Sequence, residues 1–184
     1  MANAEQKRQG DGGRFVGTTW QDLLDLETVE VPEYLRVKSN PYMGDDDLSV
    51  DRYISPAFFN EEKEKLWPKT WQMTCREEDI PESGDHFVYW IIDRSVIVTR
   101  TPSGEIKGFI NSCRHRGRCL RDESGSVDKF RCPFHGATWD LDGQFKGIPN
   151  DWDFEHIVDR DMSLPQVKVA TWGGFVFINF DLDC

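Results

Sequence analysis

The sequence predicts a mainly β fold, an antiparallel β-sandwich preceded by short helices. From about residue 69 onward, short runs of alternating apolar and polar residues are separated by turn residues, the period-2 pattern of antiparallel strands. Before that point, the apolar residues are flanked by helix start and stop signals instead. At 184 residues, the chain is long enough for one domain with an appended segment.

Two regions are expected along the chain. Residues 1–50 are acidic and contain few β-branched runs, so we interpret them as an N-terminal arm. Residues 51–184 form the expected domain. Within it, Ser55 and Pro56 signal the start of a helix and Pro68 signals its end. The apolar side chains of this helix, among them Phe58 and Phe59, are interpreted as a packing surface.

The strands are predicted by turn residues between apolar runs. Asp142-Gly143 is expected to close one hairpin, and Asp93-Arg94 another. Trp139 and Trp172 are expected in the core. The predicted strands are Phe87 to Ile92, Ser95 to Thr99, Glu105 to Asn111 after the turn Thr101 to Gly104, Val167 to Ala170, and Phe175 to Phe180.

Composition excludes several classes of function. The net charge of −11 argues against binding to nucleic acid or to an anionic membrane surface. The sequence contains no run of roughly 18 apolar residues, and its first residues are too polar for a signal peptide. Five unevenly spaced cysteines are typical of metal ligands and free thiols in a reducing compartment. We therefore expect a cytoplasmic protein.

Two short motifs carry the chemistry. Cys113-Arg-His115-Arg-Gly117 and Cys132-Pro-Phe-His135-Gly136 each supply one thiolate and one imidazole. The glycine after each histidine permits a tight backbone turn, so two such loops can converge on one metal centre. Iron or zinc suits these ligands.

The order of the ligands favours iron over zinc. Structural zinc sites usually pair two cysteines and two histidines as C-x2-4-C with H-x3-5-H. Here each loop holds one cysteine and one histidine, which suits a binuclear cluster with both thiolates on one iron and both histidines on the other. A zinc-stabilised interaction module remains the alternative.

The motif pair resembles that of Rieske proteins, and its flanks resemble the large, or alpha, subunit of ring-hydroxylating oxygenases. Roughly residues 50–182 fit that family's N-terminal region. The resemblance implies a Rieske-type antiparallel β-sandwich with a cluster-binding subdomain. The flanking segments that carry it are Ser55 through Trp71, Ile110-Asn111, Trp139 to Gly143 and Trp172 to Asn179.

The resemblance also implies the roles of the four ligands. Cys113 and Cys132 would hold one iron of a Rieske 2Fe-2S cluster, and His115 and His135 the other. Neutral imidazoles in place of two thiolates raise the reduction potential above that of all-cysteine clusters. The chain would thus pass single electrons from a ferredoxin or flavin reductase.

The family activates dioxygen at a mononuclear Fe(II), held by two histidines and a carboxylate in a C-terminal domain that is expected to be absent from this chain. This chain alone is therefore not expected to act as a dioxygenase or monooxygenase. The family's usual substrates are aromatic or related compounds, and its full-length subunits can form homo-oligomers. A stand-alone Rieske ferredoxin is the alternative, although such a small carrier has little need for an N-terminal arm.

The sequence departs from respiratory Rieske proteins at two positions. Phe134 stands where the second loop would carry a disulfide-forming cysteine, and Ala137 stands where a serine would donate a hydrogen bond to the cluster. Fewer hydrogen bonds stabilise the reduced state less, so we predict a low potential within the Rieske range.

The remaining residues near the motifs have simpler interpretations. Cys119 and Cys75 are expected to be buried thiols, and His86 and His156 strand-edge or surface residues that bind no metal. A basic group either guides an acidic electron donor or ties down loop carbonyls and nearby carboxylates. This group consists of Arg114, Arg116, Arg118, Arg121, Lys129 and Arg131.

Overall fold

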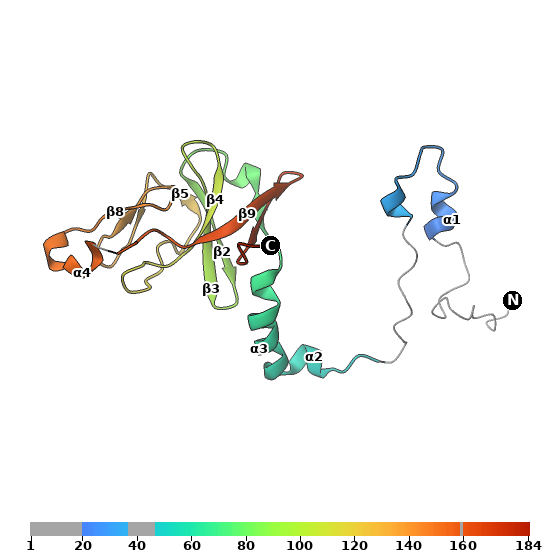
Figure 1. Ribbon diagram of the computed structural model, residues 1–184, viewed down its shortest axis with the longest axis horizontal. Helices are drawn as coiled ribbons and strands as arrows, with labels where there is room; N and C mark the ends of the chain where they lie inside the picture. Colours follow the sequence, from blue (N-terminus) through green and yellow to red (C-terminus); the bar gives the residue numbers. More distant parts are fainter. Residues whose placement is uncertain (1–19, 37–46, 159) are drawn as a thin grey trace. The chain divides into compact units, whose positions relative to one another are not determined.

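The computed structural model describes residues 20–36, 47–158 and 160–184 (Figure 1). The chain divides into two compact units, Met1–Arg52 and Tyr53–Cys184. In the first, α1 (Trp20–Leu24) is joined to the 3-10 helix η1 (Glu33–Leu35) by a hydrogen bond of 3.2 Å from Trp20 Nε1 to the carbonyl of Leu35. The rest of the expected arm, residues 1–19 and 37–46, lies outside the described residues. None of the described helices is long and apolar enough to cross a membrane.

The helix predicted after Ser55 is present. It follows α2 (Asp51–Ile54) and is α3 (Pro56–Lys65), with Ser55 Oγ accepting a hydrogen bond of 3.4 Å from the backbone N–H of Phe58. The 3-10 helix η2 (Trp67–Lys69) follows it and contains the predicted stop. The expectation that the apolar side chains of this helix form a packing surface is wrong, because Phe58 and Phe59 remain 38% and 46% exposed. The rest of α3 is dominated by Glu and Lys, so the helix has no sustained apolar face to bury.

The larger sheet has seven antiparallel strands in the order β1-β10-β9-β4-β3-β2-β5. Its interior strand β3 is buried on both faces, because Val96 and Val98 pack into one core while Ile97 packs into the other. The strands are β1 (Gln72–Arg76), β2 (Asp85–Ile91), β3 (Arg94–Arg100), β4 (Ile106–Ile110), β5 (Gly125–Ser126), β9 (Gln166–Trp172) and β10 (Phe175–Asn179), with the 3-10 helix η3 (Glu77–Asp79) after β1.

The predicted hairpins are confirmed, with one shift. The β2–β3 turn is made by Ile92 and Asp93, since Arg94 already pairs with Ile91 across the two strands. Ile92 adopts a φ of 55°, which is uncommon for a β-branched residue and explains why the sequence pattern placed the turn one residue later. Gly143 adopts a φ of 79° at the predicted turn between β7 (Thr138–Trp139) and β8 (Phe145–Gly147).

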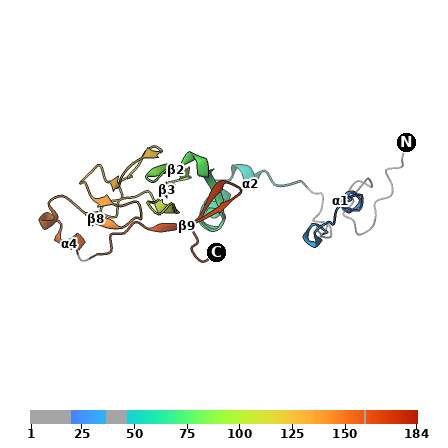
Figure 2. The ribbon, with the colours of Figure 1, turned by 90° about the horizontal axis from the view of Figure 1, so that it is seen from above.

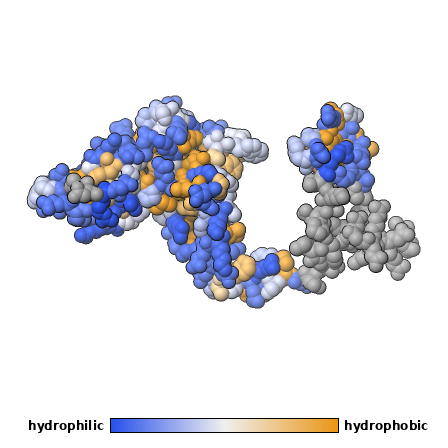
Figure 3. Space-filling view, in the orientation of Figure 1, coloured by the Kyte–Doolittle hydropathy of each residue, from blue (hydrophilic) through white to orange (hydrophobic). Residues whose placement is uncertain are grey.

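A smaller sheet forms a subdomain from β6 (Phe130–Arg131), β7 (Thr138–Trp139) and β8 (Phe145–Gly147), followed by the 3-10 helix η4 (Asp151–Asp153) and α4 (Glu155–Val158). Within the second unit, β8 and α4 lie at the end away from α3 (Figures 1 and 2). The surface over this end is mostly hydrophilic, whereas apolar side chains gather nearer the middle of the unit (Figure 3). The mainly β, antiparallel prediction is therefore confirmed.

The two tryptophans expected in the core differ in their exposure to solvent. Trp139 is fully buried and donates its indole N–H to the carbonyl of Met162 at 2.6 Å. Trp172 is 78% exposed at the end of β9, so the core prediction is wrong for it. It stands beside the β9–β10 turn, where Gly173 and Gly174 offer no side chain to pack against.

Candidate metal centre

The two ligand loops share one backbone architecture. In the first loop, which follows β4, the N–H of Cys113 donates to the carbonyl of Arg118 and the carbonyl of Cys113 accepts from the N–H of Gly117, both at 2.8 Å. Gly117 adopts a φ of 72°, in the region that glycine enters at little cost. The predicted tight turn is therefore present.

The second loop, between β6 and β7, repeats this pattern at the same spacing. The N–H of Cys132 donates to the carbonyl of Ala137 at 2.8 Å, and the carbonyl of Cys132 accepts from the N–H of Gly136 at 3.0 Å. Gly136 has a φ of 77°. Two loops of one design thus present their cysteine and histidine side chains from two neighbouring turns.

The loops bring like ligands together in pairs. The rings of His115 and His135 have their centroids 4.8 Å apart. Cys113 and Cys132 are only 4% and 2% exposed and belong to the same core. Burial raises the pKa of the Cys113 thiol, and the neighbouring thiol of Cys132 raises it further. The sulfur pair therefore lies on the buried side of the centre and the imidazole pair on the more accessible side.

This arrangement fits a binuclear centre. A thiol pair beside an imidazole pair offers two ligands to each of two metals. Among the described residues, no group of three or more His, Cys, Asp or Glu side chains is placed to hold a single metal ion.

One atom of the site lacks a partner. Nδ1 of His115 is inaccessible to solvent and makes no hydrogen bond with any described group. Burial also lowers the pKa of His115, with the charges of His135 and Arg116 adding to the effect, so the neutral ring is favoured. A buried nitrogen without a partner costs about 1–3 kcal/mol, and a metal bond to this lone pair would offset that cost. The donor set thus suits a metal cluster.

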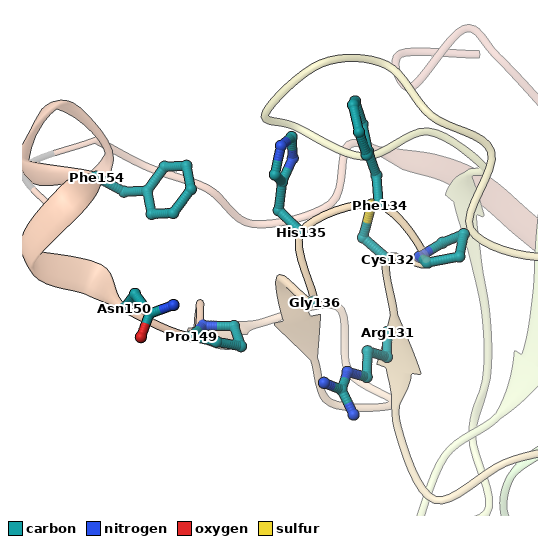
Figure 4. A pocket seen from close by; sticks show the side chains of 9 residues that line it. Arg131, Cys132, Phe134, His135, Gly136, Pro149, Asn150 and Phe154 are labelled. Atoms are coloured by element: carbon teal, nitrogen blue, oxygen red, sulfur yellow. The ribbon is translucent and has the colours of Figure 1, made fainter.

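Sequence reasoning missed an aromatic wall around the imidazoles. Phe154 lies with its ring edge toward His115 and His135, at centroid distances of 5.3 and 5.8 Å. Phe134 is 60% exposed and lies over His135 at 3.9 Å. Phe154, Phe134 and His135 line an open depression of about 590 Å³ together with Arg131. Figure 4 shows these side chains around it. No sequence signal links Phe154 to the ligands, because Phe154 lies on a separate loop beyond the second motif.

The two histidines outside the candidate ligand set differ in their exposure to solvent. His156 is exposed, as expected, although its ring centroid lies 5.9 Å from that of His115. His86 was expected at a strand edge or surface but is 2% exposed. That expectation is wrong, because a hydrogen bond of 3.0 Å from Arg121 Nε to His86 Nε2 satisfies the buried ring.

The basic group serves partly as a set of structural ties. Arg121 is bound to His86, Arg118 pairs with Asp122 at 3.6 Å, and Arg114 reaches the carbonyl of Asp161 at 3.5 Å. Three of these arginines therefore act as structural ties, and Arg131 lies open to solvent beside the depression.

The other cysteines are consistent with their interpretation as thiols. All five cysteines of the chain are free of disulfides. Cys75 is buried as expected, whereas Cys119 is only half-buried, because its thiol donates to the carbonyl of Arg121 at 3.2 Å near the surface end of the loop.

The fold and the paired loops define a Rieske-type iron-sulfur protein, and residues 70–158 match the Rieske [2Fe-2S] domain. Residues 70–158 belong to this family, and they correspond to the Rieske portion of ring-hydroxylating oxygenase alpha subunits. It is 32% identical to the alpha subunit of biphenyl 2,3-dioxygenase from Rhodococcus jostii, over 71% of this chain and 29% of that one.

Two further relatives show the breadth of the family. The chloroplastic choline monooxygenase of Beta vulgaris is 32% identical over 70% of this chain and 29% of its own length. The structure of naphthalene 1,2-dioxygenase from Rhodococcus sp. bound to indole superposes with a TM-score of 0.66 and 34% identity, covering 71% of this chain and 30% of that one. The chain therefore spans about 30% of the length of these relatives, and they include both dioxygenases and monooxygenases.

Proposed function

We propose that this chain is the electron-transfer portion of a Rieske non-haem iron oxygenase alpha subunit. In this proposal Cys113 and Cys132 bind one iron of a 2Fe-2S cluster, and His115 and His135 bind the other. The pairing of two buried thiols with two adjacent imidazoles, on loops of one backbone design, is the observation that carries it.

The cluster supplies reversible one-electron transfer, and the protein decides where the electron enters and leaves. The buried thiol side is enclosed by the core, so contact with a redox partner is possible only from the imidazole side. The exposed Phe134, which lies over His135, covers part of that side. The histidines are therefore the edge through which electrons pass.

The residues next to the sulfurs indicate a low potential within the Rieske range. Ala137 is fully buried and offers no hydroxyl group, so only backbone groups can donate to the cluster at that position. Each missing hydrogen bond leaves the more negative reduced cluster less stabilised. A low potential suits delivery of electrons to an oxygenase iron.

The partners follow from the same proposal. A ferredoxin or flavin reductase donates the electron, and the exposed Arg131 beside the depression would attract an acidic donor. The acceptor is a mononuclear iron outside these 184 residues, in a full-length subunit that assembles as a homo-oligomer and oxidises an aromatic or related compound. Five free cysteines support a reducing, cytoplasmic setting.

The test is the chemistry of the purified chain. Anaerobically purified protein should contain about two irons with acid-labile sulfide and, once reduced, give an electron-spin signal with an average g value below two. Cys132→Ser should abolish the signal, whereas Cys119→Ser, a matched change of a thiol in the first ligand loop, should keep it. A colourless protein with one zinc per chain would establish the zinc module instead.

A further inference from the structure

A hydrogen-bonded clamp closes the base of the first ligand loop, residues 112–120. Oδ1 of Asn111 accepts from the backbone N–H groups of Leu120 at 3.1 Å and of Arg121 at 3.0 Å. Its Nδ2 donates to the carbonyl of Arg121 at 2.6 Å. Asn111 is 4% exposed, so these three bonds are shielded from water. The position of Arg121 therefore fixes where the loop ends.

The side chain of Arg121 is held in turn by His86, which lies on β2 in the larger sheet. Arg121 Nε donates to His86 Nε2 at 3.0 Å. The His86 ring also meets Phe130 edge-on, at 5.8 Å and 89°, and Phe130 comes two residues before Cys132. One buried imidazole thus contacts the end of the first ligand loop and the start of the second.

Only the neutral His86 ring fits this network. A guanidinium Nε–H can only donate, so Nε2 must be the unprotonated acceptor and Nδ1 must carry the hydrogen. Nδ1 lies 3.3 Å from the carbonyl of Gly84, which accepts it. A second ring proton, on Nε2 of His86, would point at the Nε–H of Arg121. The hydrogen bond would then be replaced by two donors that face each other and by two positive charges.

The surroundings of His86 do not compensate such a charge. The charged groups that act on the ring are Arg121 from the first loop and Asp85 on its own strand, and the carbonyls of Gly84 and Glu123 face it. The packed Phe130 brings no charge. Burial lowers the pKa of His86 and the charge of Arg121 lowers it further, against the opposing effect of these carbonyls and of Asp85.

We propose that neutral His86 is a positioning residue for both ligand loops, and that its protonation releases Arg121 and opens the first loop in acid. The consequence for the cluster rests on the proposed function, since an opened loop no longer holds Cys113 and His115 in place. The opening of the loop does not depend on that function. The two parts can therefore be measured separately.

The direction of the pH effect follows from the lowered pKa. Once the loop opens, His86 is exposed to water and regains an ordinary pKa of about 6.5. Each pH unit below that value then favours the opened state by up to about tenfold, until the pKa of the buried ring is reached. Above about pH 6.5 both states are neutral and the preference for the closed loop is constant.

The experiment measures hydrogen–deuterium exchange by mass spectrometry on the full chain, with visible absorbance recorded on the same samples. Between about pH 7.5 and about pH 5, exchange in the peptide spanning residues 111–121 should rise by about tenfold or more after correction for intrinsic rates. Exchange in the β9–β10 hairpin, residues 166–179, should remain within about twofold, because no bond of the network reaches it.

Variants separate His86 from other acid effects. His86→Gln supplies a side-chain oxygen that can accept from Arg121 but does not titrate, so the acid response of peptide 111–121 should disappear. The matched control His156→Gln removes the other histidine outside the ligand set and should keep the response of the unsubstituted chain. An equal rise of exchange in His86→Gln and in the unsubstituted chain overturns the proposal.

A measurement on the unsubstituted chain covers the case in which His86→Gln does not fold. If exchange of residues 111–121 stays constant across that pH range, the proposal is overturned without any variant. If the exchange rises as expected but the protein carries no cluster at any pH, the positioning role of His86 stands and the proposed electron-transfer function fails.

Discussion

The ring of Phe154 stands almost perpendicular to the ring of His115, with an interplanar angle of 85° and centroids 5.3 Å apart. This edge-on contact screens the imidazole side of the centre from water, and it comes from a segment beyond both ligand motifs.

Replacing Phe154 with alanine should raise the reduction potential. Removing the ring admits water next to the imidazoles, and water stabilises the more negative reduced cluster. We expect a rise of about 40 mV, equivalent to about 1 kcal/mol for one electron, by voltammetry. Trp152→Ala is the control, since this ring is 69% exposed. Equal shifts in both variants would mean that Phe154 has no special role.

Ala137→Ser should also raise the potential, through a different cause. Ala137 is fully buried in the second loop, and its carbonyl already accepts from the N–H of Cys132. A serine hydroxyl there can donate to the cluster and stabilise its reduced state by about one hydrogen bond, or about 50 mV. Ala137→Gly changes the volume without adding a donor and should leave the midpoint near its original value. A rise in the glycine variant would exclude the hydrogen bond as the cause.

His135→Cys should retain a cluster with a lower potential. A thiolate places a negative charge on an iron that a neutral imidazole would otherwise hold, so adding an electron becomes less favourable. The expected fall is on the order of 100 mV, measured at about pH 8 where a free imidazole is neutral. His156→Gln should leave the midpoint unchanged. If His135→Cys also leaves it unchanged, His135 is not a ligand.

Asp140 should make the β7–β8 hairpin sensitive to acid. Partial burial opposes its ionisation, but the bond of 2.7 Å to Lys146 and the N–H groups of Gln144 and Asp142 outweigh this and lower the pKa of Asp140. Its stabilising effect is therefore complete above about pH 3.9 and is lost as the pH falls through the lowered pKa.

The size of this effect is at most about 1 kcal/mol, because solvent screens a partly exposed pair. Asp140→Asn should remove this part of the pH dependence of the free energy of unfolding, measured in urea between about pH 6 and about pH 3. Cluster absorbance is followed in parallel, so that loss of iron is not read as unfolding. Asp128→Asn, an exposed carboxylate between the two loops, should keep the slope of the unsubstituted chain.

The sequence by itself determined the antiparallel strands, most of the turns and the two ligand loops. These features depend on local causes: alternation along a strand, and a glycine at positive φ that closes a hydrogen-bonded turn within five residues of Cys113 or Cys132. The assignment of ligands to particular irons remains a prediction.

Only the tertiary structure decided which side chains are covered. His86 and Arg121 are separated by 35 positions in the sequence and form a hydrogen bond in the interior. Trp172 is exposed, and Phe154 lies beside His115. Burial depends on which elements pack against one another, and no periodicity within a single segment encodes that. For this reason the sequence identified the candidate ligands, but the supports and the aromatic cover around them became visible only in the fold.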